Sequence, residues 1–148
     1  MVAACAAFAT PAFADEPKNE EKTETMAPQV DEGSLLLDEL IFHYNQPEFK
    51  KAFCENRFYT DIKAERKGNK VTINVTTHER HDLVSYSTKN QQMMINNVRQ
   101  LLIGTAHTID KNSGTLIGYI KKNKVNFKII FTNPAGKRVT NTINYAQF

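Results

Sequence analysis

The spacing of apolar residues along the chain switches between a helical period and a strand period. Residues 34–45 place apolar side chains three and four positions apart, which predicts a helix that begins at a capping Ser34. Pro47 then suits the first turn of a second helical stretch that continues to about residue 55. From residue 58 to residue 76 the period becomes two on either side of a Gly-Asn turn, which predicts a β-hairpin.

The second half of the chain continues with a longer helix and further strands. Residues 87–106 carry apolar side chains on one helical face, and residues 116–121, 125–132 and 139–145 have the character of strands between polar turns. The predicted fold is therefore α+β, in the order helix, two strands, helix, three strands, with an antiparallel sheet of about five strands and two helices packed on one face. In architecture alone this order resembles small exported domains of the cystatin-like, nuclear-transport-factor-like and β-lactamase-inhibitor-like kinds, and that resemblance implies a fold without an activity.

The apolar start of the chain favours export. Residues 1–14 are uncharged, rich in alanine and end in Ala-Phe-Ala, so a bacterial signal peptide cut after Ala14 and a periplasmic or secreted protein are expected. Residues 2–5 offer an alternative, a lipobox acylated at Cys5, although the apolar residues that follow are not the polar tether typical of a lipoprotein. The apolar run is too short for a transmembrane helix, which needs about twenty residues.

Charge and composition divide the remainder into two parts. Residues 15–33 hold seven acidic side chains, two lysines and few large apolar residues, which predicts a disordered acidic linker. Residues 34–148 hold seventeen Lys and Arg against nine Asp and Glu, so one domain with a net charge of +8 is expected. Cys54 is the one cysteine after the predicted cut, so no internal disulfide can form, and its neighbours Phe49 and Phe53 indicate a core position.

The densest group of chemically able side chains follows the first predicted hairpin. His78 and His81 lie three positions apart, whereas the zinc-binding His-Glu-x-x-His helix requires a spacing of four. His107 and Asp110 would complete a metal site there only if the fold brought them close. A plain polar connection is the favoured interpretation, and we expect neither a metal nor another cofactor.

The sequence gives little support to an enzyme. It has no glycine-rich phosphate loop, no nucleophile elbow and no close pair of carboxylates on a predicted helix or strand. His43, beside the apolar face of the first helix, would act as a general base if a cleft opened there. The alternative hypothesis is thus a small-molecule-binding or hydrolytic pocket between sheet and helices, with His43 or the segment from His78 to His81 at its mouth.

Basic side chains near the C-terminus give the leading hypothesis. Six of them are predicted to gather on the last strands and their turns: Lys121, Lys122, Lys124, Lys128, Lys137 and Arg138. Such a patch attracts polyanions. Phe127 and Phe131 share the parity of core residues, so a nucleic-acid partner, which would need exposed rings, is not expected. We expect instead a non-enzymatic domain that binds an envelope protein, a glycan or a lipid headgroup through the sheet face or these basic strands.

Overall fold

Helices and strands make up most of what the computed structural model describes, residues 31–55 and 57–148; the expected signal peptide and residues 15–30 of the expected linker lie outside. The helices are α2 (Glu32–Tyr44), α3 (Pro47–Phe53), α4 (Thr88–Asp110) and α5 (Thr115–Lys122). The strands are β1 (Tyr59–Lys67), β2 (Lys70–Thr77), β3 (Asn126–Thr132) and β4 (Arg138–Ile143). Short 3-10 turns are η1 (Glu79–His81), η2 (Leu83–Ser85) and η3 (Tyr145–Gln147). None of the described helices is both long and apolar enough to cross a bilayer.

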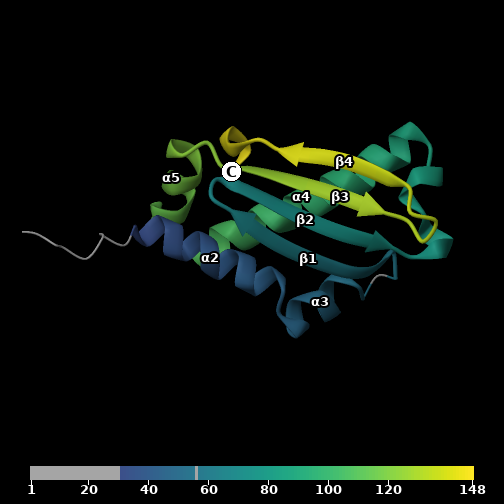
Figure 1. The fold of residues 1–148 in the computed structure, drawn as a ribbon, viewed down its shortest axis with the longest axis horizontal. Coiled ribbons are helices and arrows are strands. Elements are labelled where there is room, and N and C mark those ends of the chain that lie inside the picture. The colour runs from purple at the N-terminus through teal and green to yellow at the C-terminus, as the bar shows by residue number, and fades with distance from the viewer. Residues whose placement is uncertain (1–30, 56) are drawn as a thin grey trace, which may run out of the picture. The chain divides into compact units, whose positions relative to one another are not determined.

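The four strands form one mixed sheet in the order β1-β2-β3-β4 (Figure 1). β1 pairs with β2, and β3 with β4, as antiparallel hairpins. The central strands β2 and β3 run parallel, with Val71 opposite Phe127. The α+β class is therefore confirmed, whereas the antiparallel sheet of about five strands is wrong.

The extra predicted strand, residues 116–121, is part of helix α5. Leu116 and Ile120 are four positions apart and both fully buried, which is a helical pattern that a short apolar run hides. Gly114 precedes the helix with a φ of 77°, a left-handed conformation that glycine adopts without strain. Because α4 and α5 together carry the chain back along the sheet, β3 enters parallel to β2.

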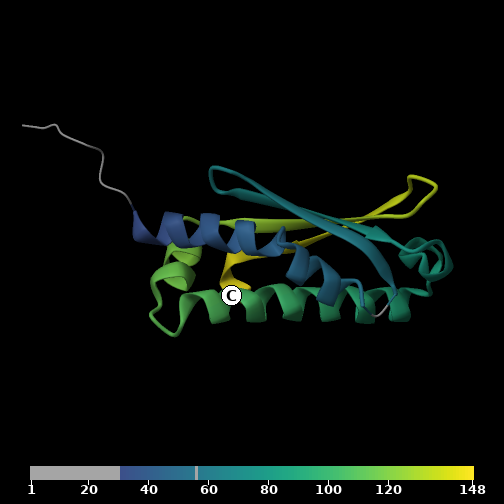
Figure 2. The ribbon, with the colours of Figure 1, turned by 90° about the horizontal axis from the view of Figure 1, so that it is seen from below.

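The described helices all lie on one side of the sheet, so four helices take the place of the predicted two (Figure 2). α4 runs beneath the sheet, and α2 and α3 lie along its β1 side (Figures 1 and 2). The core fills the space between these layers and includes Ile73 of β2, Ile129 of β3 and Leu102 of α4, all fully buried. No described element covers the other face of the sheet (Figure 2).

Helix α2 begins at Glu32, two residues before the predicted Ser34 cap. Gly33 is buried because α2 approaches α5 so closely that a Cβ on Gly33 would lie 2.4 Å from Tyr119 Cβ. Arg66 of β1 ties these helices together, donating to Asp38 Oδ1 at 3.0 Å and to Tyr119 Oη at 2.9 Å. The first turn of α2 is thus fixed by contacts from distant parts of the sequence.

A β-bulge between Tyr59 and Asp61 changes which side chains of β1 face the helices. Simple alternation predicts that Thr60 shares a face with Ile62 and Ala64. In the structure Tyr59 is buried with Ile62 and Ala64, because the bulge shifts the register and reverses the parity before it. The Tyr59 ring therefore lies beneath the sheet, on the side of the helices.

Side chains bind backbone groups of both edge strands. At β1 the Asn45 side chain accepts the Ala64 N–H and donates to the Ala64 carbonyl, each at 2.8 Å, as a neighbouring strand would. At β4 Arg99 of α4 donates to the Thr142 carbonyl at 2.9 Å. Both edges of the sheet are therefore partly capped by side chains.

Replacing Asn45 with alanine is expected to lower the free energy of unfolding by about 1.5 kcal/mol, because both backbone groups of Ala64 lose their partner. Urea unfolding followed by circular dichroism measures the change. Gln46→Ala is the matched control, since its amide makes only a 3.5 Å exposed contact and should cost less than about 0.5 kcal/mol. Equal effects of the two substitutions would show that the Asn45 contact adds nothing.

Candidate anion-binding face

The six basic residues singled out from the sequence are divided between two ends of β3. Lys121 and Lys122 end helix α5 rather than a strand, and Lys124 follows with a left-handed φ of 53°. Lys128 lies within β3, and Lys137 and Arg138 lie at the turn into β4. The seven residues of β3 span about 20 Å, so the predicted single patch is in fact two groups.

Three lysines from different segments surround one hollow on the uncovered face of the sheet. Lys70 begins β2, Lys124 precedes β3 and Lys128 lies in β3. They line a hollow of about 530 Å³; its other lining residues are Asn69, Val71, Thr72, Asn126 and Thr142. The parallel pairing creates this arrangement, because it places Lys70 opposite Asn126 and Thr72 opposite Lys128.

A fourth lysine, Lys67, lies opposite Lys70 across the first hairpin. We call Lys67, Lys70, Lys124 and Lys128 the basic corner. All four side chains are exposed, and within residues 31–55 and 57–148 none of them has an ion-pair partner. Glu65 is the acidic residue that shares a hollow with Lys67 and Lys70, which leaves a local net charge of +3. Such a concentration of uncompensated positive charge attracts anions.

The remaining side chains of this face, which we call the open face, are mostly hydroxyls and amides. The face comprises the outward residues of the four strands: Asp61, Lys63, Glu65, Lys67, Lys70, Thr72, Asn74, Thr76, Asn126, Lys128, Ile130, Thr132, Arg138, Thr140 and Thr142. These groups donate and accept hydrogen bonds beside the lysines. None of the residues in this set is aromatic, so the open face lacks the stacking platform typical of proteins that bind single-stranded nucleic acids.

Sequence reasoning found Lys124 and Lys128 but missed Lys67 and Lys70. These two flank the turn of the first predicted hairpin, which was expected to pair only within itself. Their proximity to Lys128 depends on the parallel contact of β2 with β3. The sequence does show a lysine on each side of the hairpin turn. That pattern indicates a shared basic site only once the strand order is known.

His78 and Asp82, which flank the segment considered for a metal site, each cap a short turn. His78 Nδ1 accepts the Arg80 N–H at 3.1 Å and caps η1, the turn that ends at His81. Asp82 caps η2 by accepting the Val84 N–H at 2.9 Å. His107 lies on an exposed part of α4. In the described part of the chain no group of three or more His, Cys, Asp or Glu side chains is placed to hold a metal ion.

Hydrogen bonds also set the charge of Asp82. Burial acts to raise the pKa of this carboxyl, but hydrogen bonds from Asn133, Val84 and Ser85, together with the charge of Lys137, lower it below its usual value. The carboxylate is therefore held ionised by groups that it also fixes in place.

His43 and Cys54 each pack against apolar neighbours. His43 is half-buried and packs edge-on against Phe49, with ring centroids 5.5 Å apart. Cys54 is half-buried against the core, and its pKa is raised by burial first and then by the charge of Asp61, while Lys50 lowers it. A thiol held protonated in this way is a poor nucleophile.

Comparison of the chain with protein families, with curated proteins and with solved structures found no match.

Proposed function

We propose that this protein is an exported, non-enzymatic binding domain that holds an anionic component of the cell envelope on the open face of its sheet. One observation carries the proposal: Lys70, Lys124 and Lys128, drawn from three segments, surround a hollow and have no acidic partner among the described residues. Phosphate or carboxylate groups of a glycan or a lipid headgroup are the ligand chemistry that such a hollow suits.

The layout of the domain supports this use of the sheet. All described helices pack on the opposite side, so the open face is available over four strands (Figure 2). Its threonine and asparagine side chains supply uncharged hydrogen-bonding groups next to the lysines. Export itself is inferred from residues 1–14, and it would place this face in contact with envelope polymers and headgroups.

The test compares two triple variants of the full chain that remove the same charge. The first variant combines Lys70→Gln, Lys124→Gln and Lys128→Gln. The control combines Lys121→Gln, Lys122→Gln and Lys137→Gln, three exposed lysines outside the basic corner. Binding is measured against inorganic polyphosphate and against vesicles with and without phosphatidylglycerol, at several salt concentrations.

We expect the first triple variant to weaken binding at low salt at least tenfold and to flatten its salt dependence, because fewer counterions are released. The control should weaken it less than about threefold, through net charge alone. Equal losses in both variants would reject a site at the basic corner, and no binding of the unmodified chain to either probe would reject the proposed function. Binding to polyphosphate alone would indicate a soluble polyanion as the ligand, and binding to phosphatidylglycerol vesicles alone would indicate a membrane surface.

A further inference from the structure

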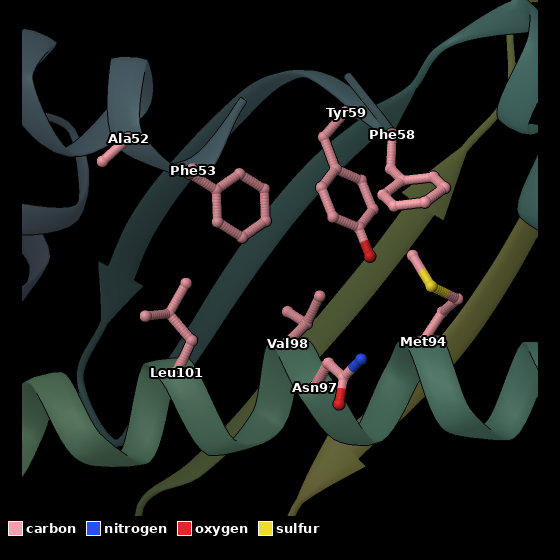
Figure 3. Close-up of a pocket in the computed structure, with 8 residues that line it drawn as sticks. All are labelled: Ala52, Phe53, Phe58, Tyr59, Met94, Asn97, Val98 and Leu101. Carbon is pink, nitrogen blue, oxygen red and sulfur yellow. The ribbon is translucent and has the colours of Figure 1, made fainter. Parts of the chain in front are cut away.

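A small pocket lies beneath the sheet, on the side opposite the open face, between α4 and the residues at the end of α3 and the start of β1 (Figure 3). Its volume is about 160 Å³. Phe53, Phe58 and Tyr59 line it from the sheet side, and Met94 and Val98 line it from α4. No Asp, Glu, Lys, Arg or His is among the lining residues, so its walls carry no formal charge.

The Tyr59 hydroxyl is the buried polar atom that points into this pocket (Figure 3). Tyr59 is 5% exposed, and its Oη is buried without a hydrogen-bond partner among the described residues. The other buried tyrosine, Tyr44, donates its hydroxyl to the Leu102 carbonyl at 2.7 Å. Folded proteins leave few buried polar atoms unsatisfied, so an exception that faces a pocket offers a contact to a molecule bound there.

The direction of the Tyr59 hydroxyl is fixed by the fold. The bulge in β1 turns Tyr59 toward the helices, and its ring stacks on Phe53 with centroids 4.8 Å apart. Burial, and secondarily the charge of Tyr86, raises the pKa of Tyr59 to about 12. The group is therefore a neutral phenol at physiological pH and has a proton to donate.

We propose that this pocket binds a small uncharged organic molecule, about the size of one six-membered ring, that presents a hydrogen-bond acceptor to Tyr59 Oη. The size follows from the volume, since a cavity of about 150 Å³ holds benzene. The neutrality follows from the lining, because an ionised group would lose its hydration there without gaining a counter-charge.

Water is a poor occupant of the same space, and entry from solvent is open. A buried water makes about three hydrogen bonds, whereas the side chains that line the pocket offer two polar groups, the Tyr59 hydroxyl and the Asn97 amide. At the mouth, Ala52 and Asn97 are exposed and Leu101 is 43% exposed, so a ligand reaches the pocket without displacing the core.

The experiment titrates the full chain with cyclohexanone, a ring with an acceptor, and with benzene, a ring of similar size without a carbonyl. Chemical shifts of Met94, Val98 and Leu101 report binding by nuclear magnetic resonance. The variants are Tyr59→Phe, which removes the hydroxyl, and Ala52→Met, which fills the mouth from an exposed position. Tyr145→Phe, at a half-buried tyrosine that does not line the pocket, is the matched control.

We expect saturable shifts with both probes, a loss of about fivefold in cyclohexanone affinity in Tyr59→Phe, and unchanged benzene affinity in that variant. Ala52→Met should abolish the binding of both probes, and Tyr145→Phe should leave the affinity for each probe unchanged. The proposal is overturned if neither probe gives saturable shifts in the unmodified chain, or if Tyr59→Phe changes the affinities for cyclohexanone and benzene by the same factor. Should Tyr59→Phe fail to fold, the Ala52→Met titration decides. Binding of polyanions, measured on the other face, is independent of each outcome.

Discussion

Replacing Asp110 with alanine is expected to lower the free energy of unfolding by about 3 kcal/mol, one of the two largest effects predicted for this protein. Asp110 ends α4 and is 4% exposed. Its carboxylate accepts the N–H groups of Leu116 at 2.7 Å and Gly114 at 2.9 Å, and the Ser113 hydroxyl at 3.0 Å. The substitution leaves the buried Leu116 N–H and the part-buried Gly114 N–H at the start of α5 without an acceptor.

The same contacts make stability depend on pH in the acid range. Burial acts to raise the pKa of Asp110, but the hydrogen bonds from Leu116, Ser113 and Gly114 outweigh it and hold the pKa below its usual value. A carboxyl with a lowered folded-state pKa contributes its full stability above its unfolded pKa of about 3.9 and loses that contribution as the pH falls through the folded value. The unmodified chain should therefore lose stability below about pH 4, and Asp110→Ala should lose less over that interval.

Urea unfolding at pH 7 and pH 3 measures both effects. Asp61→Asn is the control, since this exposed carboxylate forms only a surface ion pair with Lys50 and should change stability by less than about 1 kcal/mol. If Asp110→Ala and Asp61→Asn prove equally mild at pH 7, the carboxylate of Asp110 does not hold the turn between α4 and α5.

The second large effect is expected from Gly33→Ala, which should destabilise the fold by about 2 kcal/mol. The new Cβ would lie 2.4 Å from Tyr119 Cβ and 3.0 Å from the Thr115 carbonyl oxygen, so α2 and α5 must separate. That movement would also disturb the Arg66 hydrogen bond to Tyr119.

Gly104→Ala provides a matched substitution with the opposite expected sign. Gly104 is exposed within α4, and a Cβ there meets nothing within 4 Å. Alanine should therefore stabilise that helix by about 0.5 to 1 kcal/mol through its higher helix propensity. The midpoints of urea unfolding for the two variants should shift in opposite directions; a shift of both toward higher urea would contradict the close contact between α2 and α5.

Local patterns were sufficient to predict the elements whose partners are near in sequence. The first hairpin, the β3–β4 hairpin and the long helix that follows Ser87 all appear close to their predicted bounds. Residues 116–121 were misassigned because a short apolar run fits a strand as well as a buried helix. Once that helix was missed, the parallel pairing of β2 with β3 could not be foreseen.

The same gap limited the candidate sites. Lys124 and Lys128 could be named from composition, but their neighbour Lys70 required the strand order. Simple alternation places Tyr59 on the solvent side, because the pattern of alternating residues does not reveal a bulge. Periodicity alone therefore does not predict that the Tyr59 hydroxyl faces the pocket.

The capped edges of the sheet have a consequence for how a partner can be recognised. A peptide that joins a sheet as an extra strand needs a free row of backbone donors and acceptors. Asn45 already occupies the Ala64 N–H and carbonyl on β1, and Arg99 occupies the Thr142 carbonyl on β4. Strand addition is therefore blocked at these points on both sides of the sheet, and a peptide partner would have to be held there by its side chains rather than by its backbone.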